Sequence, residues 1–165
     1  MKKIHKLFIA ILFLYFTFFI VFTLVPYRPV PHYDIMEIHG KEWNITQLAE
    51  NDTTWQQGLM NQTITNNTMM LFVFPSEGIY SFWMKNTLAP LDMIWIDIPQ
   101  GNNGIIVSMA SNTTPCPGEN DTQCMASDYI PDHPANFVLE TQAGFIKQNN
   151  LSIGTNVSLR EMVIQ

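Results

Sequence analysis

The sequence predicts a mainly β fold, an antiparallel sandwich or barrel-like domain with one or two short helices, preceded by a single transmembrane helix. Apolar and polar residues alternate with a period of two in several short runs, which Gly, Pro and Asn separate. No strand-like run is followed by a long helical pattern, as a parallel sheet with crossover helices would require. The N-terminus instead contains one uninterrupted apolar stretch.

This apolar stretch, residues 7–25 (Leu7 to Val25), has nineteen residues and no charge. At about 1.5 Å per residue it is long enough to cross the hydrocarbon core of a bilayer. A cleaved signal peptide is the alternative, but its apolar region is usually shorter and ends in small residues. The run here closes with Leu24, Val25 and Pro26, which favours an uncleaved membrane anchor.

Three parts follow along the chain: the N-terminal lysines and anchor (1–26), a proline-rich stalk (27–33) and an extracytoplasmic β domain (34–165). Lys2, Lys3 and Lys6 precede the apolar run, and no lysine follows it closely. Positive charge collects on the cytoplasmic side of membrane segments. We therefore expect a single-pass protein of the cell membrane, with its N-terminus in the cytoplasm and the domain outside.

Acceptor sequences for N-glycosylation, Asn-x-Ser/Thr, are unusually frequent in this chain. Their abundance is typical of a glycosylated domain exposed outside the cell. The alternative is that a composition rich in Asn and Thr produces such sequences without any glycan. The acceptor residues are Asn44, Asn51, Asn61, Asn66, Asn112, Asn120, Asn150 and Asn156.

The part of the chain that follows the apolar run is strongly acidic. Of the eight Lys and Arg residues three precede the run, whereas all fourteen Asp and Glu residues follow it. Nucleic-acid binding needs clustered Lys and Arg that displace counterions from phosphates. Nucleic acid is therefore not an expected partner.

The two cysteines, Cys116 and Cys124, lie in the predicted outer domain with Pro117 and Gly118 between them. A bend there could bring their Cβ atoms to the ~3.8 Å separation of a disulfide. The alternative is a metal site with His133, but the cysteine spacing is not that of zinc ligands. We predict a disulfide, no metal and no cofactor.

Seven or eight short strands and two small helices are predicted. One helix begins near Thr53, with Gln56 at capping-box spacing and Asp52 as an alternative cap, and its Trp55 is expected to pack on the sheet. Residues 142–149 are expected to form a helical turn or two. The extended runs are 33–38, 41–48, 69–74, 79–85, 91–98, 105–110, 136–141 and 155–163.

A cluster of polar residues lies within the most apolar block of the domain. The runs 79–85 and 91–98 are separated by five residues and are expected to form a hairpin that brings Lys85 and Asn86 close to Asp92. With Thr87, these residues are the candidate site.

Two interpretations of this cluster remain open. In a binding pocket, Asp92 is a base or acceptor, Lys85 a cation, and Asn86 and Thr87 orient a ligand against Trp83. In a structural cluster, Asp92 pairs with Lys85 and accepts hydrogen bonds from the turn, so that no buried charge is left alone.

Five motifs occur in a fixed order: GLM at 58–60, MLFVF at 70–74, FWMKNTLAPLD at 82–92, VLETQAG at 138–144 and IGTNV at 153–157. Through them the chain resembles the family called domain of unknown function 192, over roughly residues 45–161. The resemblance implies a small, mostly β sandwich found in bacteria and archaea, without an established activity. The dense glycosylation sequences look more like those of an archaeal surface protein.

The resemblance extends to the candidate site residues, which are Trp83, Lys85, Asn86, Thr87, Asp92 and Glu140. It fails at three positions. Members usually carry arginine where this chain has Trp55 and Gln62, and glycine where it has Met69. Any role of those arginines in binding an anion is therefore in doubt here.

Two classes of function follow from the sequence. The first is a membrane-anchored binding or interaction module for a small molecule, glycan or protein. The second is an extracytoplasmic, hydrolase-like enzyme that uses Asp92 and Lys85, or a carboxylate pair of Asp92 and Glu140 if their separation suits hydrolysis. No nucleophile motif, metal-ligand set or phosphate loop supports the enzyme, so the binding module is favoured.

Overall fold

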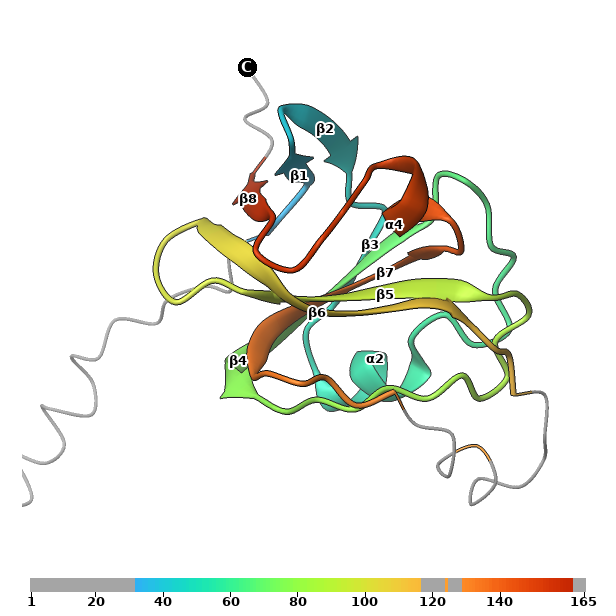
Figure 1. The fold of residues 1–165 in the computed structure, drawn as a ribbon. Coiled ribbons are helices and arrows are strands. Elements are labelled where there is room, and N and C mark those ends of the chain that lie inside the picture. Colours follow the sequence, from blue (N-terminus) through green and yellow to red (C-terminus); the bar gives the residue numbers. More distant parts are fainter. Residues whose placement is uncertain (1–31, 117–123, 125–128, 162–165) are drawn as a thin grey trace, which may run out of the picture. The chain divides into compact units, whose positions relative to one another are not determined.

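The structure is a computed structural model that describes residues 32–116, 124 and 129–161. Within these residues eight strands form one sheet in the order β2-β1-β8-β6-β5-β7-β4-β3 (Figure 1). The described pairings are antiparallel, except that β3 runs parallel to β4. The prediction of a mainly β fold is confirmed. The strands are β1 (Ile35–Ile38), β2 (Lys41–Asn44), β3 (Gln47–Ala49), β4 (Met69–Gly78), β5 (Leu91–Asp97), β6 (Asn103–Thr113), β7 (Ala135–Gln142) and β8 (Asn156–Arg160).

The sheet curls into a half-barrel, which agrees with the barrel-like alternative of the prediction and not with the sandwich. Figure 1 shows β1, β2 and β8 turned over one face of the central strands, with the short helix α4 (Phe145–Gln148) on the same side. The helix α2 (Asp52–Gln57) lies against the other face. The described strands thus form one layer that bends over itself, not two sheets packed face to face.

Two buried apolar clusters occupy the two faces of the sheet. Side chains alternate between faces along a strand, so successive residues of β5 enter alternate clusters and both faces of this strand are buried. The cluster inside the curl includes Met36, Ile38, Leu71, Ile94, Ile96, Ile106, Leu139 and Leu159. The cluster under α2 includes Leu59, Met70, Phe72, Phe82, Met93, Trp95 and Val138.

Residues 79–85 do not form the strand that their alternating pattern predicts. Around Phe82 the backbone makes only an isolated bridge to Tyr129. The expected hairpin with 91–98 is wrong as well, because β5 already pairs with β6 on one side and β7 on the other. The segment is held by backbone hydrogen bonds of Phe82 to Tyr129 and of Met84 to Cys116. The indole of Trp95 adds a side-chain bond, donating to the Tyr80 carbonyl at 2.9 Å.

Three other strand boundaries differ from the prediction. The run 41–48 is broken into β2 and β3, which lie on opposite edges of the sheet. Strand β4 continues through Pro75 to Gly78, with an irregular register after Val73 where its pairing with β7 is interrupted. Strand β6 is longer at both ends than the predicted run 105–110.

Helix α2 begins at Asp52, and its N-cap is Asn51, two residues before the predicted cap Thr53. The side chain of Asn51 accepts a hydrogen bond from the Thr54 N–H at 3.1 Å, and the Thr54 hydroxyl accepts one from the Asn51 N–H at 3.1 Å. This reciprocal pair is a capping box. The predicted caps are therefore helical residues: Asp52 is the first residue of the helix and Thr53 the second.

Residues 1–31, with the predicted anchor at 7–25 and most of the stalk, lie outside the described residues. In the part of the chain that the structure describes, no helix is long and apolar enough to cross a membrane. Asn120 also lies outside the described residues. The other seven acceptor asparagines are all exposed: Asn44, Asn51, Asn61, Asn66, Asn112, Asn150 and Asn156.

The predicted disulfide between Cys116 and Cys124 is confirmed, with their Cα atoms 5.7 Å apart. Cys116 is also tied to the segment that precedes β5. Its N–H donates to the Met84 carbonyl at 2.9 Å, and its carbonyl accepts from the Asn86 N–H at 3.0 Å. The disulfide therefore closes a loop that is hydrogen-bonded to the predicted site segment.

Candidate functional site

An aromatic groove lies on the face of the sheet that α2 covers. Its volume is about 290 Å³. The rings support one another, since Phe74 and Tyr80 are stacked with centroids 3.7 Å apart, and Trp55 lies 5.1 Å from Phe74. The residues that line the groove are Trp55, Phe72, Phe74, Ile79, Tyr80, Ser81, Phe82 and Trp83.

Two polar side-chain groups on the walls of the aromatic groove, those of Trp55 and Tyr80, are bonded within the protein. The indole N–H of Trp55 donates to the Ala49 carbonyl at 2.9 Å. The hydroxyl of Tyr80 donates to the Ser76 carbonyl at 2.8 Å. Because these bonds use the polar ends of both side chains, what the two rings offer a ligand is mainly apolar surface.

A small chamber adjoins the aromatic groove, because Trp55, Phe72, Phe82 and Trp83 line both cavities. Its volume of about 20 Å³ has room for about one water molecule. Glu140 lines this chamber and is 3% exposed. Its Oε2 atom has no hydrogen-bond partner among the described residues. Such an oxygen is rare in a folded protein and suggests a role other than packing.

Burial raises the pKa of Glu140 to about 8. The cause is the loss of water around the carboxylate, which disfavours the ionised form. At neutral pH the side chain is therefore mostly protonated. A protonated carboxyl group has an O–H that donates a hydrogen bond, in addition to its acceptor oxygens.

Gly58 leaves space beside Glu140. It ends α2 with a φ of +46°, a left-handed value that glycine adopts most readily. A Cβ atom at this position would lie 3.4 Å from Phe72 Cζ and 3.6 Å from Glu140 Oε2. A side chain longer than that of alanine would reach the chamber, so the glycine of the GLM motif both ends the helix and preserves the cavity.

Four of the six predicted site residues meet at the chamber, namely Trp83, Lys85, Thr87 and Glu140. The Nζ atom of Lys85 is 5.2 Å from the centroid of the Trp83 ring, which is within cation–π distance. Thr87 is buried. Asn86 does not line the chamber, and its backbone N–H and carbonyl join neighbouring segments instead.

Asp92 lies on the opposite face of the sheet from Glu140. In the pairing of β5 with β7, Asp92 is opposite Thr141 and Met93 is opposite Glu140, and neighbouring positions point to different faces. The carboxylate pair of Asp92 and Glu140 that the sequence left open is therefore not formed.

The hydrogen bonds of Asp92 also differ from the predicted ones. Its Oδ1 accepts from the Asn112 N–H at 2.8 Å, and its Oδ2 accepts from the N–H groups of Gly144 and Ile146 at 3.0 and 2.8 Å. Three segments far apart in sequence thus converge on one buried carboxylate. The donors come from β6 and the start of α4, whereas the structural interpretation of the sequence expected Lys85 and the turn at 86–90.

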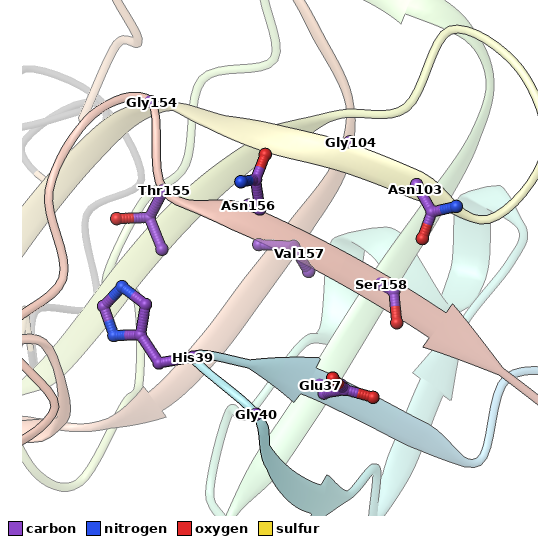
Figure 2. Close-up of a pocket in the computed structure, with 10 residues that line it drawn as sticks. All are labelled: Glu37, His39, Gly40, Asn103, Gly104, Gly154, Thr155, Asn156, Val157 and Ser158. Atoms are coloured by element: carbon purple, nitrogen blue, oxygen red, sulfur yellow. The ribbon is translucent and has the colours of Figure 1, made fainter.

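A second groove of about 700 Å³ lies beside the β1–β2 turn (Figure 2). Its lining includes the polar side chains of Glu37, His39, Asn156 and Ser158. Figure 2 shows these side chains spread along the groove, and none of the four is buried. Glu37 is already paired with Arg160 at 3.1 Å. Thr155 also lines this groove and is buried, but its hydroxyl already accepts from the Ser152 N–H at 3.1 Å. This polar groove is therefore a weaker candidate than the aromatic one.

The aromatic wall is the part of the site that the predicted elements do not reveal. The sequence pattern assigns Trp55 to packing, and it assigns Phe72 and Phe74 to an ordinary strand. A partial signal was the parity of positions 72, 74, 80 and 82, which are all aromatic. Residues of equal parity in a strand face the same side, so Phe72 and Phe74 share one face of β4. The chain is irregular between Phe74 and Tyr80, so their parity alone could not place Tyr80 and Phe82 on that face.

The family of the protein follows from a match over residues 35–159 to DUF192, a family described as "Uncharacterized ACR". The match covers more than half of the chain, and the chain belongs to this family. The resemblance seen in the sequence motifs is thereby confirmed. Curated proteins provide no match.

Two solved structures are similar to this one. A protein from Sinorhizobium meliloti 1021, described as a "putative transcription regulator", is 27% identical with a TM-score of 0.61, and the alignment covers 79% of this chain and 98% of that chain. A protein of unknown function from Novosphingobium aromaticivorans DSM 12444 is 23% identical with a TM-score of 0.60, and the alignment covers 79% and 89%. The second likeness concerns the fold alone.

Proposed function

We propose that the protein is a binding module that recognises a small organic molecule in the aromatic groove, with Glu140 as the polar group at the inner end. The observation that carries this proposal is the buried Oε2 atom of Glu140, which has no partner among the described residues and lines a chamber next to the groove. Small-molecule sites are typically concave and mainly apolar, with a few convergent polar groups. A buried acid with a shifted pKa in such a cavity is a usual mark of function.

The cost of Glu140 to the fold also supports a binding role. A buried polar group without a hydrogen bond destabilises a protein by roughly 1–3 kcal/mol. An apolar side chain of similar size at this position would avoid that cost. A residue that lowers stability and lines a cavity is better explained by ligand recognition than by folding.

A hydrolase-like enzyme based on Asp92 and Lys85 is the second candidate function, and the geometry favours it less. A general base needs a lone pair directed at the substrate. Both carboxylate oxygens of Asp92 already accept backbone N–H groups, and the side chain is 1% exposed. Asp92 is better assigned to holding β5, β6 and the start of α4 together.

The proposed module is attached to a membrane by residues 7–25, with the N-terminus in the cytoplasm and the β domain outside. The lysines before the apolar run support this orientation. Support also comes from the exposure of seven acceptor asparagines and from the disulfide, which is typical of an oxidising compartment. Such dense acceptor sequences suit a glycoprotein of an archaeal cell surface.

Nucleic acid is not proposed as a partner, although the Sinorhizobium protein is described as a "putative transcription regulator". From Tyr27 onward the chain has five basic residues against fourteen acidic ones. Such a charge repels a phosphate backbone, and clustered cations are what non-specific DNA binding requires.

The binding proposal is tested by removing one wall of the aromatic groove. Small aromatic fragments would be titrated by ligand-observed NMR against the full chain in lipid nanodiscs. We expect Trp83→Ala to weaken their binding at least tenfold, because Trp83 lines both the groove and the chamber.

Trp43→Ala is the matched control for this test. Trp43 is also half-buried, but it packs against Phe145 and the cluster inside the curl, with ring centroids 5.4 Å apart. Binding should persist in this variant. Equal fragment binding by the wild type and Trp83→Ala would contradict the proposal. Loss of fragment binding in Glu37→Ala would show that the fragments bind in the polar groove instead.

A further inference from the structure

We infer that the aromatic groove takes an uncharged ligand with a flat apolar body and one terminal hydrogen-bond acceptor, such as a carbonyl oxygen, which sits in the chamber beside Glu140. This inference rests on the proposed function and specifies the chemical class of its ligand. Nothing in the family description or in the similar structures assigns such a ligand.

The walls of the aromatic groove determine the body of the ligand. Six aromatic residues line it, and the polar atoms of Trp55 and Tyr80 are already bonded to backbone carbonyls. A sugar ring would bring many hydroxyl groups, and most of them would lose water without gaining a partner. A planar apolar ring instead gains dispersion and stacking contacts over its whole surface.

The chamber determines the end group of the ligand. Its volume of about 20 Å³ admits one small polar group and no more. Glu140 is the buried residue there with an unpartnered oxygen, and in its protonated form it offers an O–H donor. A carbonyl or ether oxygen in the chamber would accept this hydrogen bond and remove the cost of leaving the group unpaired.

The charges around the chamber argue against an ionised ligand. Lys85 lines the same cavity, so its ammonium group disfavours a second cation there. Lys85 would attract an anion, but an anion would also face a domain whose acidic residues far outnumber its basic ones, and it would lose its hydration in an apolar groove. An uncharged acceptor avoids both penalties.

Affinity for such a ligand depends on the protonation of Glu140. Among the described residues, the titratable groups that line the chamber are Glu140 itself, from β7, and Lys85, from the segment before β5. Helix α2 and the residues after it contribute Gln56, Gln57 and apolar residues, and β4 contributes Phe72, so these elements add no charge. Because burial places the pKa of Glu140 near 8, its donor proton is lost as the pH rises above this value.

Four related probes test the inference: benzamide, toluene, benzylamine and benzoate. They share one ring and differ in the polar group, which is an uncharged acceptor, none, a cation and an anion. We expect the full chain in nanodiscs to bind benzamide at least tenfold more tightly than the other three at pH 6.5. Between pH 6.5 and pH 9.5 benzamide affinity should fall at least fivefold.

Two variants of Glu140 identify the hydrogen-bond donor. Glu140→Gln keeps a donor that does not titrate, so it should retain benzamide binding at both pH values. Glu140→Leu has no donor and should bind benzamide no better than toluene at either pH. This pattern would separate a donor role of Glu140 from a role as a charge.

Other outcomes would overturn the inference in distinguishable ways. Benzylamine binding that strengthens with pH and disappears in Glu140→Gln would show a cation site and reject the neutral ligand. Equal affinity for benzamide and toluene would reject any role of Glu140 in recognition. If none of the four probes binds the wild type more tightly than Trp83→Ala, the proposed function itself fails.

Discussion

At the scale of single residues, Glu140 makes the stability of the domain depend on pH. Burial raises its pKa from 4.5 to about 8. Between these values the unfolded chain has released the proton that the folded chain retains, so a rise in pH favours unfolding by up to about 1.4 kcal/mol per pH unit. We expect the free energy of unfolding, measured by urea titration, to fall between about pH 5 and pH 8.

Glu140→Gln should remove most of this pH dependence, because a neutral amide does not titrate. The exposed residue Glu77 provides the control, and Glu77→Gln should keep the slope of the wild type. Identical slopes for the wild type and Glu140→Gln would mean that Glu140 is ionised in the folded protein at neutral pH.

Asp92 stabilises the fold, in contrast to Glu140, because both of its carboxylate oxygens accept hydrogen bonds from backbone N–H groups. An asparagine at position 92 has one acceptor oxygen, and its amide group would face at least one of the N–H donors of Asn112, Gly144 and Ile146. We expect Asp92→Asn to lower the free energy of unfolding by about 3 kcal/mol. Chemical denaturation of this variant measures the loss.

Asp132→Asn is a suitable control for that measurement, since Asp132 is exposed. Its effect should stay within about 0.5 kcal/mol. A similarly small effect of Asp92→Asn would show that the three N–H groups find other acceptors, and the structural assignment of Asp92 would then be lost.

At the scale of elements, the disulfide loop supports one side of the candidate site. Replacing both Cys116 and Cys124 by serine should lower stability by about 2.5 kcal/mol, the value expected for closing so short a loop. The backbone bonds of Cys116 to Met84 and Asn86 should also weaken. Hydrogen exchange should therefore accelerate at the Asn86 amide.

The amide of Ile94 offers a comparison for this experiment, because it lies in a central strand that is paired on both sides. Its exchange should change only through the loss of global stability. Unchanged exchange at Asn86 in the double serine variant would show that the site segment does not depend on the disulfide.

Elements that a local apolar pattern determines could be predicted, whereas elements that depend on strand pairing could not. Strands β5 and β7 were predictable, since runs that are apolar on both faces have few alternatives to the centre of a sheet. The segment 79–85 has an equally regular alternation, yet it is not a strand because both sides of β5 are taken by later strands, β6 next in the chain and β7 further on. No local pattern reports which pairing positions are already occupied.

The same distinction applies to the site. Trp83, Lys85, Thr87 and Glu140 could be selected because polar residues in apolar surroundings are conspicuous in a sequence. The sequence could not show that they are separated from Asp92, because this separation depends on the strand register, which places Met93 rather than Asp92 opposite Glu140. A shift of one residue in that register would have reversed the result.

At the scale of the whole molecule, the proposed topology gives a direct test. In cells that glycosylate exported proteins, we expect the full chain to remain with membranes and to gain mass that an amidase specific for N-glycans removes. Protease added to intact cells should digest the β domain. Both expectations follow from an anchor at 7–25 with the domain outside.

A chain without residues 7–25 is the matched control for this test. It should leave the membrane fraction and carry no glycan, because it lacks a segment that could direct the domain across the membrane. A full-length protein that is protected from external protease and has unmodified asparagines would contradict the topology.

The two outermost strands of the sheet are short, with four residues in β2 and three in β3. Each margin therefore presents few unpaired backbone groups, and β2 carries the exposed charges of Lys41 and Glu42. Short margins, and charge on one of them, discourage a neighbouring copy from adding its own strand. Even densely crowded copies of this domain should consequently remain individual molecules and not extend into fibrils.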